Sequence, residues 1–483
     1  MTEEPRFVED LTDQTDNFSR WYTEVILKAE LADYAPVRGC MVIRPYGFAL
    51  WENIQRLLDG RIKATGHKNA YFPLLVPESL LAAEAEHVEG FAPQVAWVTQ
   101  GGNDKLEERL AIRPTSEAII GTMYSKWIQS HRDLPLLINQ WANVMRWEMT
   151  TRLFLRTAEF LWQEGHTVHR TEEEGQEETM KMLEVYRDFV ETEMAIPVIK
   201  GRKTEREKFA GAEATYSIEA LMRDGKGLQA GTSHNLGQHF AKVYDITFQD
   251  IDGERRYAWQ ASWGVSTRLI GALIMVHGDD AGLIMPPNVA PIQTVIVPIW
   301  KNDEEQASVS AMVSEVQALL PKDLRVEADM RGEYTPGWKY NEWELRGVPV
   351  RMEIGPKDVQ KRSVVLVRRD NRKKEFVPID EIATRLPALL QEFQNDLFQR
   401  AVQFREENTC EAATLEELNA TISEKRGFVK AFWCGDTKCE EAVQAETGAT
   451  IRCIPFDARE HGKGKCIKCG AESDIQALFA KAY

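Results

Sequence analysis

The stretch NVMRWEMTTRLFLRTAEFLWQEGH, residues 143–166, decides the fold because it reads as two strands that meet at a short loop. Side chains two positions apart on a strand project from the same face, so Arg146 and Glu148 are predicted to share one surface. Residues 149–153 form the loop, and Arg156 lies on the returning strand. An isolated Arg-x-Glu would most simply be a surface ion pair. A second guanidinium that faces the same cleft favours a polyphosphate instead.

The second half of this stretch gathers aromatic rings and hydrogen-bond acceptors. Four residues alternate there at strand spacing and are predicted to face one side: Phe160, Trp162, Glu164 and His166. A sheet with one solvent-exposed face would give the same pattern. The alternation indicates a binding site only because arginines lie beside it.

Three other segments in the first part of the chain concentrate polar groups. Arg113-Pro-Thr115-Ser-Glu117 introduces a predicted helix over residues 118–129, and helix capping alone would explain it. The glycines and hydroxyls of residues 229–237 suit a backbone that approaches a ligand closely, and a plain turn explains them equally well. Residues 262–271 pass from a strand into an apolar helix, where Arg268 either snorkels to the surface or binds an anion.

The surrounding sequence indicates further elements. Apolar spacing predicts an amphipathic helix over residues 47–66, and a strand over 69–77 in which Pro73 fits only an edge or an interface. Residues 172–193, with nine Asp/Glu and two Lys/Arg, read as a helix with a solvated face. The proline-rich residues 285–292 mark a domain boundary.

Beyond that boundary, strands and helices alternate as in a compact α/β domain. A helix over residues 382–407 then leads to a segment rich in cysteine. The predicted domains are therefore residues 1–290, 291–395 and 396–483.

The charge of the chain bears on its partners. The 483 residues include 59 Lys+Arg and 75 Asp+Glu, a net charge of −16 that would repel a phosphate backbone if it were evenly spread. Residues 346–374, however, hold ten Lys/Arg and three Asp/Glu, and we expect this basic stretch to attract RNA in a salt-sensitive way. The longest apolar run covers residues 269–276, too short to cross a bilayer. With no import signal at the start of the chain, we expect a cytoplasmic protein outside the membrane.

The cysteines point to a metal. Five of the seven lie in the last fifty residues, and two chelating pairs fit a tetrahedral structural zinc site: Cys434 with Cys439, and Cys466 with Cys469. Cys453 lies between the pairs and is predicted to be a buried free thiol, as are Cys40 and Cys410.

Taken together, these motifs resemble those of the class II aminoacyl-tRNA synthetases and, in detail, of the prolyl-tRNA synthetases. The resemblance covers nearly the whole chain and rests on residues 113–117, 146–148, 154–156, 159–166, 231–234 and 277–280. It implies a multidomain α+β and α/β protein. An antiparallel-sheet catalytic domain would be followed by an α/β anticodon-binding domain and a small zinc-binding domain.

The resemblance also implies a role for each site residue. ATP, with Mg²⁺, would be bound by Arg146, Glu148, Arg156, Gln229, Thr232 and Arg268, of which Arg146 and Arg268 would act in catalysis. Proline would be bound by Thr115, Glu117, Arg146, Phe160, Trp162, Glu164 and His234. In the second domain, Arg346 and Trp343 are candidate contacts for the anticodon.

The implied activity is activation of L-proline with ATP, followed by transfer to the 3′ end of tRNA(Pro). The alternatives are a related synthetase, such as a threonyl enzyme, and a catalytically inactive synthetase-like tRNA-binding protein. The short gap between Arg156 and Ser262 implies the archaeal/eukaryotic-like type without an inserted editing domain. A homodimer through residues 47–77 is expected. Tyr483 either folds its carboxylate back toward the active site or is an ordinary frayed terminus.

Overall fold

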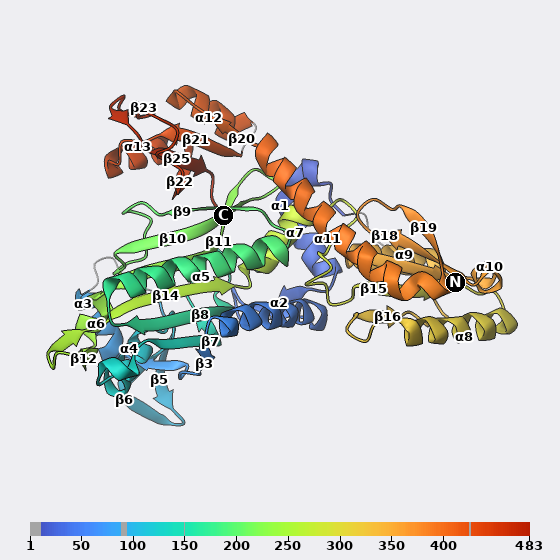
Figure 1. Ribbon diagram of the computed structural model, residues 1–483, viewed down its shortest axis with the longest axis horizontal. Coiled ribbons are helices and arrows are strands. Elements are labelled where there is room, and N and C mark those ends of the chain that lie inside the picture. The colour runs from blue at the N-terminus through green and yellow to red at the C-terminus, as the bar shows by residue number, and fades with distance from the viewer. Residues whose placement is uncertain (1–10, 88–93, 149, 425–426) are drawn as a thin grey trace.

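The computed structural model describes residues 11–87, 94–148, 150–424 and 427–483 (Figure 1). Its main feature within these residues is a sheet of 11 strands in the order β20-β21-β25-β22-β9-β10-β11-β14-β8-β7-β3. The strands of its catalytic half are β3 Lys68–Asn69, β7 Leu136–Met145, β8 Glu159–His169, β9 Val198–Arg202, β10 Ala214–Leu221, β11 Gly227–Gly237 and β14 Trp259–Ser266. The pairs from β9 to β7 are antiparallel, which confirms the predicted class of sheet.

The register of three central strands places the polar side chains in rows. Glu164 on β8 lies opposite Gly264 on β14, and Gly264 lies opposite Thr232 on β11. The next row runs in the same way through His166, Ser262 and His234. Because every second side chain of a strand projects to the same face, both rows face one side of the sheet.

Helix α5 (Glu172–Thr192) covers the other face (Figure 1). Ser233, which alternates with the site residues, donates a hydrogen bond of 2.7 Å to the Thr179 carbonyl of this helix. Trp263 packs edge-on against Tyr186, also on α5. The predicted acidic helix is confirmed, although Glu178 is buried rather than solvated and pairs with Lys181.

The chain bends away from strand geometry at residues 146–148 and 150–158, contrary to the sequence prediction. Strand β7 ends at Met145 and β8 begins at Glu159, so Arg146 and Glu148 do not lie on one strand, and Arg156 does not lie on the returning strand. Phe154 adopts a φ of 61°, and the Arg152 N–H bonds the Arg156 carbonyl at 2.6 Å across the resulting turn. This local turn replaces the ladder that alternation alone would predict.

The amphipathic helix is confirmed as α2 (Pro45–Ala64), which buries Leu50, Ile54 and other apolar residues. The predicted strand over 69–77 is wrong in its middle, because it divides into β3 and β4 (Leu75–Pro77). The connection is held by a hydrogen bond of 2.6 Å from the Phe72 N–H to Gln140 Oε1.

Smaller elements surround this core. The N-terminal ones are α1 Gln14–Lys28, β1 Ala32–Tyr34 and β2 Met41–Ile43. One end of the sheet carries α3 Glu78–His87, β5 Trp97–Gly101, β6 Asp104–Ile112, α4 Glu117–Trp127, α6 His239–Val243, β12 Thr247–Gln249 and β13 Arg255–Tyr257. Helix α7 (Arg268–His277) follows β14, as predicted, and is buried along its apolar residues.

The second region has its own five-stranded sheet in the order β16-β15-β17-β18-β19, as predicted for a compact α/β unit. Its elements are β15 Thr294–Pro298, α8 Asp303–Leu319, β16 Val326–Ala328, α9 Pro336–Leu345, β17 Val350–Ile354, α10 Pro356–Lys361, β18 Ser363–Arg368 and β19 Lys374–Pro378. The predicted helix over residues 382–407 is α11 (Ile382–Glu407), which leads to the third region (Figure 1).

The C-terminal region adds strands to the catalytic sheet. Its elements are β20 Thr409–Glu411, α12 Leu415–Glu424, β21 Phe428–Phe432, α13 Thr437–Thr447, β22 Thr450–Pro455, β23 Gly464–Lys465, β24 Glu472–Ser473 and β25 Gln476–Ala480. Strand β22 pairs with β9, so one sheet runs through both regions. Among the described residues, no helix has both the length and the apolar character needed to cross a membrane.

Candidate active site

A pocket of about 280 Å³ opens on the face of the sheet opposite α5. It is lined by ten of the residues predicted for ATP and proline: Thr115, Glu117, Arg146, Phe160, Trp162, Glu164, Gln229, Thr232, His234 and Arg268. The structure therefore brings together side chains that are spread over more than a hundred residues of sequence.

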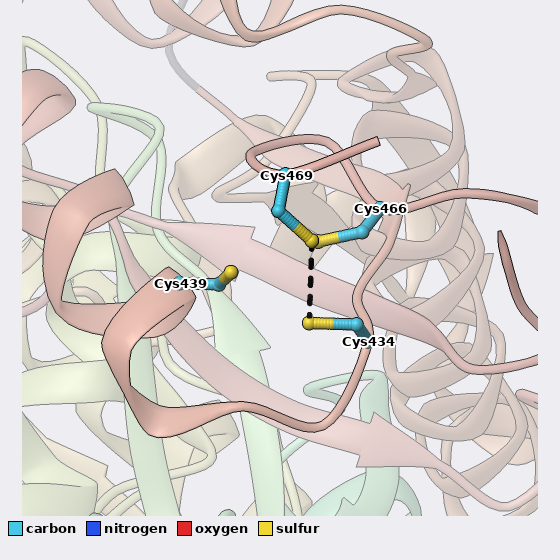
Figure 2. A group of neighbouring side chains, drawn as sticks. All are labelled: Cys434, Cys439, Cys466 and Cys469. Atoms are coloured by element: carbon cyan, nitrogen blue, oxygen red, sulfur yellow. Dashed lines mark hydrogen bonds between the residues drawn. The ribbon is translucent and has the colours of Figure 1, made fainter. Parts of the chain in front are cut away.

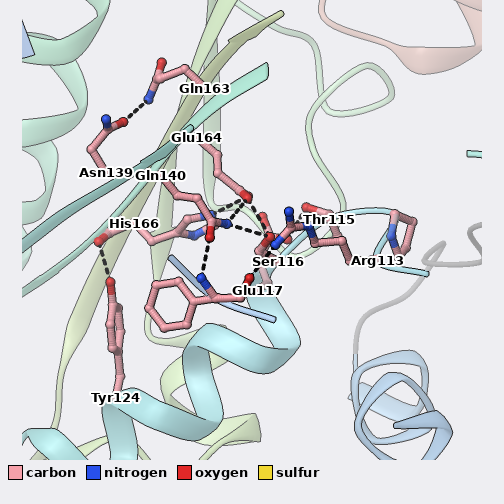
Figure 3. A network of polar contacts seen from close by, with 12 residues as sticks. Arg113, Thr115, Ser116, Glu117, Tyr124, Asn139, Gln140, Gln163, Glu164 and His166 are labelled. Carbon is pink, nitrogen blue, oxygen red and sulfur yellow. Dashed lines mark hydrogen bonds and ion pairs between the residues drawn. The ribbon is translucent and has the colours of Figure 1, made fainter. Parts of the chain in front are cut away.

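Glu164 is the centre of a buried polar network at the floor of this pocket (Figure 3). It accepts hydrogen bonds from Ser116 Oγ at 2.5 Å and from Gln140 Nε2 at 2.8 Å, and His166 Nε2 lies 2.9 Å from its other oxygen. Burial alone would raise the pKa of Glu164, but His166 and the two hydrogen bonds outweigh it and lower that pKa. The pKa of His166 is raised by the same contact, against the effect of burial. The contact therefore favours the charged form of both residues.

The start of helix α4 supplies a second carboxylate to the pocket. Helix capping by Thr115 or Ser116 is wrong, because neither side chain caps the helix. Thr115 Oγ1 donates instead to Glu117, and Ser116 donates to Glu164. The hydroxyls that resemble a capping motif in the sequence thus orient the acidic groups of the pocket (Figure 3).

Arg146, which directly follows β7, and Arg268, the first residue of α7, line the same pocket. Arg146 Nε donates to the Pro114 carbonyl at 3.0 Å, and its guanidinium lies 5.6 Å from the Phe160 ring centroid. Arg268 Nε donates to the Leu155 carbonyl at 3.2 Å. Burial and then the charge of Arg146 lower the pKa of Arg268. Two partly desolvated cations that repel each other make a site for an anion between them.

Glu148 and Arg156 lie outside the pocket lining. They pair with each other, with Arg156 Nε 2.8 Å from Glu148 Oε2, and the side chain of Arg156 is 60% exposed. Arg146 lines the pocket and Glu148 and Arg156 do not, so the prediction that Arg146 and Glu148 share one surface and that Arg156 faces the same cleft is wrong.

Gln229 and Thr232 both face the pocket because of a β-bulge. Residues three apart on a regular strand point to opposite faces. In β11 the register shifts, so that Ile218 pairs with Gly231 while Glu219 pairs with Gln229. The extra residue re-aims one side chain. Of the two alternatives for residues 229–237, the plain turn is therefore wrong, since the segment belongs to strand β11.

One wall of the pocket was not predicted from the sequence. Glu207 and Phe209 come from residues 203–213, the loop between β9 and β10, and Thr215 follows this loop. The Phe209 ring lies 4.8 Å from the ring of His234, whose Nδ1 is 2.9 Å from Thr215 Oγ1. Burial lowers the pKa of His234 to about 3, so the ring is neutral. The loop has no regular pattern that could have indicated this position.

The four predicted cysteine ligands form a group at a distance from this pocket (Figure 2). The Sγ atoms of Cys434, Cys439, Cys466 and Cys469 all lie within 4.8 Å of one another, and Cys469 Sγ is 3.8 Å from Cys434 Sγ. Zn–S bonds of about 2.3 Å in a tetrahedron imply sulfur atoms about 3.8 Å apart. Burial would raise the pKa of Cys466, but backbone N–H groups that include those of Lys468 and Cys469 lower it to about 7, which favours the thiolate.

The other cysteines lie outside this group. Cys453 and Cys40 are buried free thiols as predicted, whereas Cys410 is exposed. The last residue, Tyr483, is not frayed, because its hydroxyl donates to Asp224 Oδ2 at 2.6 Å.

Comparison with known proteins shows to which family this chain belongs. Three family models match the chain: "tRNA synthetase class II core domain (G, H, P, S and T)" over residues 97–277, "Anticodon binding domain" over 293–389 and "Prolyl-tRNA synthetase, C-terminal" over 415–483. A proline–tRNA ligase of Natranaerobius thermophilus is 61% identical over 479 residues, 99% of each chain. The chain belongs to the prolyl-tRNA synthetase family.

Other members of the prolyl-tRNA synthetase family agree. Proline–tRNA ligase 2 of Clostridioides difficile is 56% identical over 99% of both chains. The crystal structure of the prolyl-tRNA synthetase from Cryptosporidium parvum, complexed with halofuginone and AMPPNP, has a TM-score of 0.92, with 43% identity over 98% of this chain and 97% of that one. These comparisons confirm the predicted fold class and the ligase function, and favour them over the inactive tRNA-binding alternative.

Proposed function

We propose that the pocket activates L-proline with ATP and then transfers the prolyl group to tRNA(Pro). The observation that carries this assignment is the meeting of two arginines, a buried carboxylate network and aromatic walls in one pocket. The arginines suit the phosphates of a nucleotide, and the carboxylates suit the ammonium group of an imino acid.

Each residue then has a role in binding. Arg146 holds the α-phosphate of ATP, and Arg268 reaches the γ-phosphate and stacks on adenine. Gln229 and Thr232 line the nucleotide end of the pocket, where they offer neutral oxygen ligands to the Mg²⁺ that accompanies ATP. Bound Mg²⁺ supplies charge neutralisation at the phosphates.

Glu148 and Arg156 bind ATP from the rim of the site. Their ion pair must open so that Glu148 meets the adenine edge and Arg156 meets the phosphate tail. Because Arg156 is largely exposed, this separation costs little.

The amino-acid end of the pocket is built for a flat apolar ring with a charged nitrogen. Phe160 and Trp162 meet at nearly right angles, with centroids 6.1 Å apart, and form the apolar walls. The acceptors for the two N–H groups of proline are Thr115, Glu117 and Glu164. The neutral ring of His234 closes the polar side.

The protein acts on both steps by positioning and charge stabilisation. In the first step, an oxygen of the proline carboxylate attacks the α-phosphorus in line, and the bond to pyrophosphate breaks. Arg146, held by the Pro114 carbonyl, stabilises the charge that develops on the α-phosphate. In the second step, a ribose hydroxyl at the 3′ end of the tRNA attacks the activated carbonyl, and AMP leaves.

Proline-dependent exchange of pyrophosphate into ATP tests the first step without tRNA. We expect exchange with proline and none with threonine. No exchange with any amino acid would refute the proposed chemistry, whereas exchange with threonine alone would refute the assignment of the amino-acid pocket.

We also propose the finer type, an archaeal/eukaryotic-like enzyme without an inserted editing domain. All residues between β8 and β14 belong to α5, the strands β9–β13, α6 and their connections. The domain limits 1–290, 291–395 and 396–483 remain our division of the chain, although residue 395 lies inside α11. Seven free cysteines agree with a cytoplasmic location.

A homodimer through residues 47–77 is the assembly that we propose. This unit exposes three large apolar side chains, with Tyr71 at 71%, Phe48 at 41% and Leu75 at 37%, and burial of this apolar surface would favour an interface. Its strand β3 is the edge of the large sheet. Sedimentation of the protein should give twice the mass of 55.1 kDa, and Tyr71→Arg should shift it toward the monomer. A monomeric wild-type protein would refute the proposal.

A further inference from the structure

The loop of residues 203–213, which supplies Glu207 and Phe209 to the pocket, is attached to the C-terminal region at its first residues. Immediately before it, β9 pairs with β22, with Arg202 opposite Ile454 and Gly201 opposite Pro455. The wall of the amino-acid pocket therefore begins at the junction between the two regions.

Lys203, the first residue of the loop, is fixed by a buried ion network. Its Nζ donates to Glu219 Oε1 at 2.7 Å and to the Arg452 carbonyl at 2.5 Å. Arg452 Nη2 donates to the other oxygen of Glu219 at 2.8 Å. All three side chains are at most 8% exposed, so the network holds the base of the loop away from water.

Thr204, the next residue, connects the loop to helix α13 of the C-terminal region. Its hydroxyl donates to Glu440 Oε1 at 2.9 Å and accepts from the Glu207 N–H at 3.3 Å. Both Thr204 and Glu440 are 2% exposed. A single hydroxyl thus joins a buried carboxylate of one region to the backbone of a pocket residue in the other.

From Thr204 the contacts continue to the pocket. The Lys208 N–H bonds the Thr204 carbonyl at 3.0 Å, and the Phe209 N–H bonds Thr215 Oγ1 at 2.9 Å. Phe209 packs on His234, which also contacts Thr215. A shift of Thr204 would therefore move the Phe209 wall relative to the fixed strand that carries His234.

We propose that Glu440 is a positioning residue for proline binding, which acts through Thr204 on the loop of residues 203–213. The inference rests on the proposed amino-acid pocket. In this view the C-terminal region serves the first chemical step, because its α13 sets the position of one pocket wall. Neither Thr204 nor Glu440 lies on β11 or α7, which carry the nucleotide end, so we expect ATP binding to be little affected.

The main test measures the KM values for proline and for ATP in pyrophosphate exchange by the full-length Thr204→Val variant. This change keeps the shape of the side chain and removes its hydroxyl. We expect the KM for proline to rise about tenfold, as for loss of a buried hydrogen bond to a charged group, with the KM for ATP within about twofold of wild type. Thr204→Ser should restore the wild-type value.

Glu440→Ala, which removes the other partner of the hydrogen bond, should also raise the KM for proline and leave the KM for ATP unchanged. Glu441→Ala, at an exposed neighbour on α13, is the matched control. Because Glu440 follows Cys439, the zinc content of both variants is measured. Thr204 lies outside α13 and away from the zinc ligands in the sequence, so Thr204→Val tests the proposal even if Glu440→Ala fails to fold. Amide hydrogen exchange of residues 205–212 should become faster in Thr204→Val and remain unchanged in Glu441→Ala.

An unchanged KM for proline in folded Thr204→Val would overturn the inference, as would an equal rise in both KM values. Phe209→Ala separates this failure from failure of the pocket assignment. If Phe209→Ala raises the KM for proline while Thr204→Val does not, the pocket stands and the link to Glu440 is wrong. If neither variant changes it, the assignment of this wall to the proline pocket is wrong.

Discussion

The environment of Arg146 supports its proposed role in binding the α-phosphate. Burial lowers the pKa of Arg146, while Glu117 and Glu164 act in the opposite direction. Burial and then the charge of Arg146 lower the pKa of Arg268, although Glu219 acts in the opposite direction. A cation kept in this setting costs free energy unless an anion arrives.

Arg146→Ala should therefore reduce kcat for proline-dependent pyrophosphate exchange by about 10²–10³-fold, the loss typical of one donor to a developing negative charge. Steady-state exchange kinetics measure the effect, and circular dichroism should show an intact fold. Arg20→Ala, at a side chain that is 70% exposed, serves as the control. Near-normal exchange by Arg146→Ala would show that the phosphate assignment is wrong.

The His166–Glu164 pair predicts a pH-dependent contribution to stability. The folded pKa of His166 is raised above its unfolded value of about 6.5. Its contribution is therefore complete below pH of about 6.5 and is lost as the pH rises through the folded pKa. The difference in Tm between wild type and His166→Gln should be largest near pH 6 and should shrink toward pH 9.

His234→Gln provides the opposite sign as a control. The folded pKa of His234 is lowered to about 3, so the wild-type protein loses stability relative to this variant as the pH falls below about 6.5. The same pH dependence for both variants would contradict the assigned charge states.

At this scale the sequence predicts which residues meet better than it predicts how they are held. The alternation of Trp162 and Glu164 leads directly to the pocket, because strand geometry fixes the direction of side chains. The hydroxyl of Thr115 could not be assigned in advance, since capping and a bond to Glu117 require the same local sequence. Glu207 lies in an irregular loop, where no period relates sequence to direction.

At the scale of the elements, the pairing of β8 with β14 depends on the close approach of Gly165 on β8 to Trp263 on β14. A Cβ added there would lie 2.1 Å from the ring of Trp263, which is itself 1% exposed and packed against α5. The strand pair therefore leaves no space for a side chain on the face opposite the pocket.

Gly165→Ala should lower the free energy of unfolding by about 1–3 kcal/mol, the usual cost of overpacking a core. Urea unfolding followed by tryptophan fluorescence measures the loss. Gly253→Ala is not a suitable control because its φ is 86°, whereas Gly60→Ala on α2 meets nothing within 4 Å and should be neutral or stabilising. Equal stability of Gly165→Ala and wild type would contradict the packing of Trp263.

The cysteine group predicts a structural role for zinc between α13 and the β23–β24 hairpin. Metal analysis of the purified protein should give one zinc per chain. Cys434→Ser should lower the zinc content and the Tm, because metal binding free energy is also folding free energy. Cys410→Ser, at an exposed cysteine outside the group, should leave both unchanged. Zinc well below one per chain in the wild type would refute the site.

Element boundaries follow the sequence closely where long patterns exist. Helix α11 begins and ends at the predicted residues 382 and 407, because its apolar spacing persists over 26 residues. The segment after β7 departs from prediction because a turn with Phe154 in a left-handed conformation interrupts the alternation. Such a turn depends on packing that no local pattern records.

On the scale of the whole molecule, the basic stretch over residues 346–374 offers less free positive charge to RNA than its composition predicts. Most of its arginines form ion pairs within the protein, as Arg346 does with Glu30 and Arg369 with Asp279. Trp343 is 4% exposed and cannot stack on a base, which corrects its status as a candidate anticodon contact. Within the described residues of this stretch, the lysines that form no direct ion pair are Lys357, Lys361 and Lys373, all exposed.

A triple variant, Lys357→Ala with Lys361→Ala and Lys373→Ala, should weaken binding of tRNA(Pro). It should also reduce the slope of log K against log salt by up to about 3, because each lost phosphate contact removes about one unit. Filter binding at several salt concentrations measures both effects, and pyrophosphate exchange without tRNA should be unchanged. An unaltered salt slope would place the RNA contacts elsewhere.

The position of β25 has a consequence for synthesis of the chain. This strand, residues 476–480, lies between β21 and β22 in the sheet, although it follows both of them in the chain. Until β25 has left the ribosome, β21 and β22 each present an unpaired edge to the cell. A chain that is truncated before β25 keeps both edges open, so such truncated products should aggregate and be degraded rather than be partly active.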